Sequence, residues 1–197
     1  MKYLIYFEPP PKISGPIEKY REVNSSFFVS KGNLHGTLMA ARFLPEKEKE
    51  IIGALESIIF TPFDISVGTT TLFDKREGRK SLVVQIEPSV ALHSLHLQII
   101  EKSQEYMSIK DMPLLEEWGE FSSDLKRRAV YERYGSPFFA EFYSPHISLG
   151  EVVPSFPILE MNPPFLPESD RVTSFYLARK EKEWKVIHEY KAKNHLA

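Results

Sequence analysis

The sequence predicts an α+β protein of two similar lobes, related by a pseudo-two-fold axis. Each lobe is a small, mostly antiparallel sheet with helices on its outside, and a central groove lies between the lobes. Three observations support this prediction. The composition, with 42% hydrophobic and 26% charged residues, is that of a globular chain able to bury a core. Strand-like segments alternate with helical ones. The order of a strand, a connection and a hairpin occurs twice, so we expect one bilobal domain over residues 1–197.

The first half of the chain alternates between strand and helix patterns. After Pro45, which suits the first turn of a helix, Ile51, Leu55 and Ile58 recur at helical spacing. Side chains branched at Cβ are frequent in residues 63–73 and favour a strand there. The expected elements are a strand over 2–8, a helix near 17–23, a strand over 33–41, a helix from Pro45, and a hairpin of 63–73 with 81–86.

The rest of the chain carries a second series of elements. Pro88 opens a helix in which Leu92, Leu95 and Ile99 recur at helical spacing. Prolines are frequent over 154–167, which indicates an irregular connection. The expected elements are a helix from Pro88, a helix within 114–134, a strand over 142–153, the proline-rich connection, and two last strands over 171–179 and 184–190.

Charge and residue usage exclude several classes of function. Lys and Arg number 25 against 27 Asp and Glu, so at a net charge of −2 no global field draws the chain to nucleic acid or an anionic membrane. The absence of cysteine excludes disulfides, a thiolate nucleophile and cysteine-ligated zinc or iron-sulfur sites. The apolar run 3–7 is too short for a signal peptide, and no apolar stretch reaches the ~18 residues of a membrane span. We therefore expect a soluble, cytoplasmic protein that does not bind membranes.

Two of the predicted strands carry the same motif, a histidine followed two places later by a hydroxyl residue. The copies are His35-Gly36-Thr37 and His146-Ile147-Ser148. Because side chains alternate along a strand, His35 and Thr37 share one face about 6 to 7 Å apart, and His146 and Ser148 do the same. If the pseudo-two-fold axis places these strands side by side, two imidazoles and two hydroxyls converge on one spot that could hold a phosphate. The alternative is that both histidines are structural.

The doubled motif resembles that of the two-histidine (2H) phosphoesterases. This superfamily includes 2′,3′-cyclic nucleotide phosphodiesterases and bacterial 2′-5′ RNA ligase-like proteins. The resemblance implies a bilobal fold, metal-independent phosphodiesterase chemistry and catalytic roles for His35, Thr37, His146 and Ser148. It extends over most of the chain and includes the opening strand with its exit at Pro9–Pro11, the strand around His35, the segments 62–65 and 83–88, and residues 143–149.

Two histidines can perform the expected reaction near neutral pH, where imidazole titrates without special tuning. For a 2′,3′-cyclic phosphate, a neutral imidazole takes a proton from the attacking water, and an imidazolium protonates the departing ribose oxygen. Thr37 and Ser148 would donate hydrogen bonds to the non-bridging phosphate oxygens. In the relatives the histidine of the second motif usually activates water, which implies that His146 is the base and His35 the acid. No cofactor and no metal are expected.

The function that we expect is hydrolysis of a 2′,3′-cyclic phosphate of RNA ends or nucleotides. A 2′-5′ oligonucleotide phosphodiesterase or ligase is the nearest alternative, because ligation reverses the same bond chemistry. A non-catalytic RNA- or nucleotide-binding module is the second alternative. The expected partner is a nucleotide or an RNA terminus. The sequence implies no protein partner, and we expect a monomer.

Tyr143 and a basic segment are further candidates for substrate contacts. Tyr143 lies three residues before His146 and could stack on a substrate base, although packing in the sheet would also explain it. A mixture of basic and aromatic residues can hold a phosphate backbone, and a solvated helix face is the alternative. The basic segment consists of Lys126, Arg127, Arg128 and Arg133 with Tyr131 and Tyr134.

Four histidines lie outside the motifs. His93 and His96 are three positions apart on a predicted helix and could bind a metal if acidic partners came from elsewhere. We interpret them as exposed helix positions. His188 and His195 are expected to be structural and to face solvent.

Overall fold

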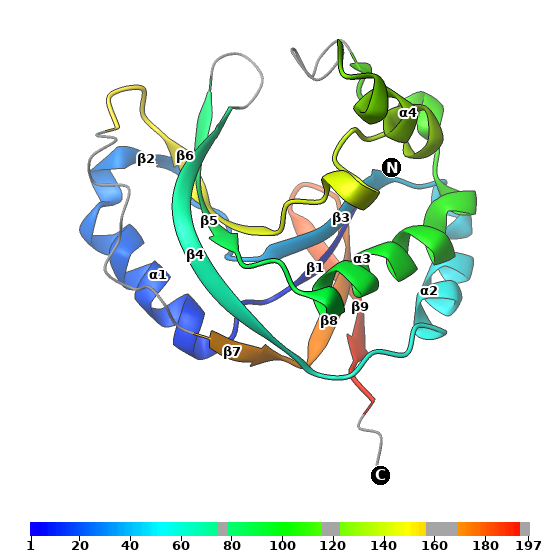
Figure 1. Cartoon of the computed structure of the whole chain (residues 1–197), viewed down its shortest axis with the longest axis horizontal. Coiled ribbons are helices and arrows are strands. Elements are labelled where there is room, and N and C mark those ends of the chain that lie inside the picture. The colour runs from blue at the N-terminus through cyan, green and yellow to red at the C-terminus, as the bar shows by residue number, and fades with distance from the viewer. Residues whose placement is uncertain (75–78, 116–122, 157–168, 194–197) are drawn as a thin grey trace.

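The computed structural model describes residues 1–74, 79–115, 123–156 and 169–193, and its architecture is α+β (Figure 1). Within these ranges the chain forms nine strands and four α-helices. The strands are β1 (Lys2–Phe7), β2 (Phe28–Ser30), β3 (Gly36–Arg42), β4 (Phe63–Asp74), β5 (Lys80–Ile86), β6 (His146–Val152), β7 (Ser169–Val172), β8 (Ser174–Lys180) and β9 (Trp184–Lys191). The helices are α1 (Pro11–Val23), α2 (Glu48–Glu56), α3 (Val90–Ser103) and α4 (Leu125–Tyr134).

The strands form one antiparallel path, in the order β7-β4-β5-β6-β3-β1-β8-β9. In the middle of this path β3 and β6 pair through a single residue pair, Gly36 with Ile147. We therefore distinguish a β3 half-sheet (β3, β1, β8 and β9) from a β6 half-sheet (β6, β5, β4 and β7). The remaining strand, β2, pairs with the far end of β6. These two antiparallel units confirm the predicted α+β fold with internal repetition.

The two sequence repeats exchange their hairpins. The β4-β5 hairpin follows β3 in the chain, but it pairs with β6. The last hairpin, β8-β9, follows β6 in the chain, but it joins the β3 half-sheet through β1. Each half-sheet is therefore built from both halves of the sequence, and neither can be completed by a contiguous segment.

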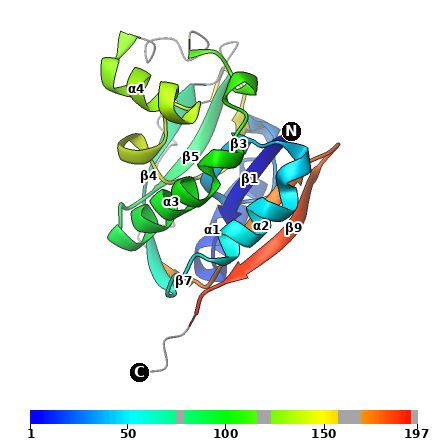
Figure 2. The same ribbon diagram turned by 90° about the vertical axis from the view of Figure 1, so that its right-hand side faces the viewer.

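Helices α2 and α3 contact each other and cover the β3 half-sheet, whereas α1 contacts β7 of the β6 half-sheet (Figures 1 and 2). The helical spacing seen in the sequence turns one face of each helix inward. Ile51 and Leu55 of α2 and Leu95 and Ile99 of α3 are almost completely buried in the core. Each such side chain contributes roughly 1.5–3 kcal/mol through removal of apolar surface from water. None of the helices in the described ranges is long and apolar enough to cross a membrane.

Several predicted elements differ at their ends. The predicted strand over 33–41 begins at Gly36, and the one over 142–153 begins at His146. The predicted strand begins later because Phe142 belongs to a short 3₁₀ turn, Ala140–Phe142, which opens at a φ of 53°. The predicted strand over 171–179 is divided at Thr173 into β7 and β8, which belong to different half-sheets. Most of the proline-rich connection lies outside the described residues.

Candidate active site

The single pairing between β3 and β6 brings the two motifs together. Gly36 pairs with Ile147, and the strands are antiparallel. If the register of this pair extends by one residue in each direction, Thr37 lies opposite His146 and His35 opposite Ser148, all on one face of the sheet. Directly opposed residues have Cβ atoms about 4.5–5.5 Å apart. In this register each histidine would lie across from the hydroxyl residue of the other motif.

Both motif histidines are oriented by the same local hydrogen bond. Nδ1 of His35 lies 2.8 Å from the carbonyl oxygen of Asn33, and Nδ1 of His146 lies 2.9 Å from that of Ser144. A carbonyl can only accept, so in each ring Nδ1 carries a proton and donates it. In the neutral ring the lone pair is therefore on Nε2. In both motifs, the carbonyl two residues before the histidine thus selects the tautomer with its proton on Nδ1.

The surroundings of His146 disfavour its protonated form. Burial lowers the pKa of His146, its hydrogen bond to the Ser144 carbonyl raises it, and the charge of His35 lowers it again. Desolvation is the largest of these effects, so the pKa of His146 lies below its ordinary value. His35 influences this ring by its charge, which agrees with the closeness that the strand register implies.

Aromatic rings flank the two histidines. The centroid of the Tyr6 ring lies 5.8 Å from that of His35, edge to face, and the Phe73 ring lies 4.7 Å from that of His146. Tyr6 is also stacked on Tyr176 of β8 at 5.4 Å. Sequence reasoning did not find these rings, because it could not tell which strands lie next to the motif strands.

Tyr143, in the segment before β6, contacts both β3 and α3. Its hydroxyl donates to the Thr37 carbonyl at 3.0 Å, and its ring is stacked on His96 with centroids 3.9 Å apart and planes 9° apart. Burial raises the pKa of this phenol well above its usual range. One ring face and the hydroxyl of Tyr143 are thus already engaged, which favours packing over stacking on a substrate base.

The prediction that His93 and His96 are exposed helix positions is wrong for His96, which is completely buried, while His93 is half-buried. Both ring nitrogens of His96 are hydrogen-bonded to backbone groups, so neither is available to a metal. The signal was present in the sequence. At four positions after Leu92 and three before Ile99, His96 falls on the apolar face of α3.

The remaining candidates lie in other surroundings. His188 is half-buried, and its Nε2 lies 3.3 Å from a carboxylate oxygen of Glu56, whereas His195 lies outside the described residues. In the basic segment, the guanidinium of Arg127 lies 4.3 Å from the centroid of the Phe142 ring and Arg128 forms a 3.4 Å ion pair with Glu132. These contacts suit a solvated helix, and a phosphate-binding role of this segment stays a prediction.

The fold and the paired motifs are those of a two-histidine phosphoesterase. The chain belongs to the 2′-5′ RNA ligase superfamily, whose sequence model matches residues 9–183. This confirms the family that the doubled motif predicted. No curated protein sequence matches the chain.

Solved structures share the fold. TT0787 of Thermus thermophilus is 16% identical with a TM-score of 0.67, and the match covers 99% of this chain and 100% of that one. E. coli LigT, crystallised with 3′-AMP, is 16% identical with a TM-score of 0.62, and the match covers 98% of each chain. Kluyveromyces marxianus Usb1 is 9% identical with a TM-score of 0.51, and the match covers 96% of this chain and 97% of that one. At these identities the likeness concerns the fold alone.

Proposed function

We propose that this protein is a metal-independent phosphodiesterase that hydrolyses a 2′,3′-cyclic phosphate at an RNA end or in a nucleotide. The observation that carries this proposal is the shared orientation of the two motif histidines. Each donates Nδ1–H to the carbonyl two residues before it, and so presents Nε2 for proton transfer on the same face of the sheet. Two imidazoles in this arrangement can act as a base and an acid on one phosphate.

The lowered pKa of His146 supports its assignment as the base. In its neutral form, Nε2 takes a proton from water as the water oxygen attacks phosphorus. Protonated His35 gives its Nε2 proton to the ribose oxygen as the bond from that oxygen to phosphorus breaks. The product is a phosphate monoester with a free hydroxyl, and proton exchange with solvent resets both rings. Thr37 and Ser148 donate to the non-bridging oxygens, where negative charge increases in the transition state.

Two observations support a nucleotide as the substrate. Aromatic rings flank both histidines, and nucleobases stack on such rings. Among proteins of the same fold, E. coli LigT has been crystallised with 3′-AMP and with phosphate. We extend this binding class to the present chain as part of the proposal.

The test is product analysis with a 2′,3′-cyclic nucleotide beside a 2′-5′-linked dinucleotide, in EDTA, with His35→Ala and His146→Ala as controls. We expect hydrolysis of the cyclic phosphate that survives chelation, because two imidazoles can move both protons without a metal. Preferential cleavage or joining of the 2′-5′ bond would favour the alternative substrate. Binding without turnover would favour the non-catalytic module, and activity restored only by a divalent ion would refute the mechanism.

A further inference from the structure

The junction between the motif strands has little backbone pairing of its own. β5 and β6 form six pairs, from Lys80 with Val152 to Gln85 with His146, with one register shift after Leu82. In contrast, β3 and β6 share a single pair. A ladder this short does not fix the register of two strands strongly. Other contacts must therefore hold the motifs opposite each other, and two side chains outside the motifs supply them.

His96 is the first of these side chains. It projects from α3 into the core, where its Nδ1 lies 2.7 Å from the carbonyl oxygen of Leu38 in β3. Its Nε2 accepts a 3.1 Å hydrogen bond from the backbone N–H of Ala140, in the segment that leads into β6. One ring with a proton on Nδ1 and a lone pair on Nε2 satisfies both groups, so His96 is neutral. Burial, the dominant influence, lowers its pKa to about 4.

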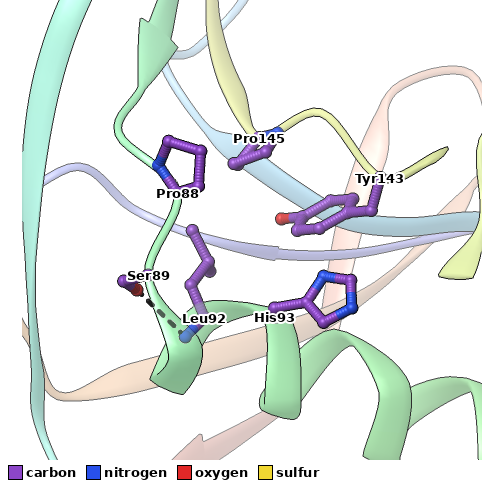
Figure 3. Close-up of a pocket in the computed structure, with 6 residues that line it drawn as sticks. All are labelled: Pro88, Ser89, Leu92, His93, Tyr143 and Pro145. Carbon is purple, nitrogen blue, oxygen red and sulfur yellow. Dashed lines mark hydrogen bonds between the residues drawn. The ribbon is translucent and has the colours of Figure 1, made fainter. Parts of the chain in front are cut away.

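Tyr143 is the second side chain that holds the motifs opposite each other. Its ring is stacked on His96, and its hydroxyl donates to the carbonyl of Thr37. The ring lies beside His93 and Pro145 above the first turn of α3 (Figure 3). Successive carbonyls of β3, at Thr37 and Leu38, are thus bound by two stacked side chains, one of which lies three residues before His146.

We infer that His96 and Tyr143 are positioning residues that hold the β3 and β6 motifs in catalytic register. Together they connect the strand of Thr37 to the segment that enters β6 at His146. The inference rests on the proposed function, because register matters where a proton must move between two imidazoles and one phosphate. Misplacement of reacting groups by about 1 Å can lower a rate on the order of 10²-fold.

Tyr143→Phe tests this inference with the least disturbance, because it keeps the stacked ring and removes only the hydrogen bond to Thr37. The matched control is Tyr3→Phe, which removes a 2.9 Å hydrogen bond from a buried tyrosine hydroxyl to a carboxylate oxygen of Glu48, near the start of β1. We expect Tyr143→Phe to lower kcat about tenfold with KM nearly unchanged, and Tyr3→Phe to change neither. A purely structural role would lower the stability of both variants and leave kcat per folded molecule intact.

Two substitutions of His96 separate its hydrogen bond to Leu38 from its apolar packing. In His96→Asn the side-chain amide takes the place of Nδ1–H and can still donate to Leu38, whereas His96→Leu keeps only the apolar bulk. We expect kcat to recover partly in the Asn variant relative to the Leu variant. Equal kcat in both, measured on protein shown to be folded, would contradict the role of the Leu38 hydrogen bond.

A measurement without substrate distinguishes failure of this inference from failure of the proposed function. The titration midpoint of His146, followed by NMR of its ring, should rise in His35→Gln because the opposing charge is removed. We expect this rise to be roughly halved in a Tyr143→Phe background, because the coupling weakens as the rings separate, and to be unchanged in Tyr3→Phe.

If the wild-type protein hydrolyses no cyclic nucleotide but Tyr143→Phe reduces the coupling, the proposed function fails and the positioning role stands. If Tyr143→Phe matches Tyr3→Phe in both kcat and coupling, the positioning role is overturned.

Discussion

The two motif histidines share a local geometry but not an environment. Each is oriented by the carbonyl two residues before it, and each directly precedes one member of the Gly36–Ile147 pair. His146 is in addition desolvated, and its protonation is opposed by the charge of His35. The neutral form, which a base needs, is therefore favoured at His146.

The pH dependence of kcat/KM should report the proposed roles of His146 as base and His35 as acid. A base works in its neutral form, so activity should fall on the acid side only below the ordinary histidine pKa of about 6.5, since the pKa of His146 is lowered. An alkaline limb should follow loss of the proton from the acid. The two limbs belong to the coupled pair rather than to single residues.

Either histidine variant, His35→Ala or His146→Ala, should lower kcat roughly 10²- to 10⁴-fold and remove one limb. The double variant should be little worse than either single one, since the two act as a unit. A flat profile from about pH 5 to 9 in active single variants would count against acid-base catalysis by this pair.

Loss of a motif hydroxyl should affect kcat and the pH profile differently from loss of a motif histidine. Thr37→Ala or Ser148→Ala should lower kcat roughly 10²-fold, as loss of a donor to the developing oxyanion does. The pH profile should keep its shape, because a hydroxyl does not titrate in this range. Thr37→Val is a control that keeps the shape of threonine and removes its hydroxyl. Activity of Thr37→Val near that of wild type would show that the hydroxyl is not a donor.

At the scale of elements, β3 owes its position to the glycine inside the first motif. A Cβ on Gly36 would collide with the ring of Phe7, which is completely buried in β1. The motif strand can therefore approach β1 closely only because this residue has no side chain. The same position pairs with Ile147 across the junction, so a displacement here would move both motifs.

Gly36→Ala should lower the free energy of unfolding by about 1–3 kcal/mol through overpacking, and it should lower kcat as well. Gly53→Ala is the matched control, because no atom lies within 4 Å of a Cβ built on this exposed glycine of α2. It should stabilise the protein by up to about 1 kcal/mol, since alanine has the higher helix propensity. Urea unfolding checks whether the free energy of unfolding falls in Gly36→Ala and rises in Gly53→Ala. Equal stability of the two variants would contradict the packing argument.

At the scale of the whole molecule, the exchange of hairpins makes the two half-sheets interdependent. The β3 half-sheet needs β8 and β9 from the end of the chain, and the β6 half-sheet needs β4 and β5 from its first half. The buried side chain of His96 lies where α3, β3 and the segment before β6 meet. Protonation of the His96 ring therefore weakens the contact between the β3 and β6 half-sheets.

The stability of the protein should fall in acid for this reason. The folded state lowers the pKa of His96 from 6.5 to about 4, so the unfolded chain binds the proton first as the pH falls. The stabilisation is complete above about pH 6.5 and is lost as the pH approaches about 4, a change of roughly 3 kcal/mol.

Urea unfolding at several pH values should show this loss in the wild-type protein. His96→Asn should flatten the dependence, because amides do not titrate. His93→Asn makes the same chemical change at a neighbouring half-buried ring and should retain most of the slope, because the charge of His93 is the smallest of the influences on the pKa of His96. An unchanged slope in His96→Asn would show that another group causes the acid sensitivity.

The sequence by itself determined the local elements, the doubled motif and the family. Strand and helix follow from side-chain spacing, and prolines mark where elements end, which are properties of neighbouring residues. The pairing of each histidine with a hydroxyl residue on one strand face follows from the period of two. For the same reason, the burial of His96 could have been predicted from its place on the apolar face of α3.

Only the tertiary structure decided which hairpin pairs with which motif strand, and which aromatic rings lie beside the histidines. Strand pairing depends on contacts between residues far apart in the chain, and period-two patterns fit more than one partner. The lowered pKa of His146 was decided there too, because desolvation and neighbouring charge depend on what packs around a ring, and the motif itself carries no trace of them.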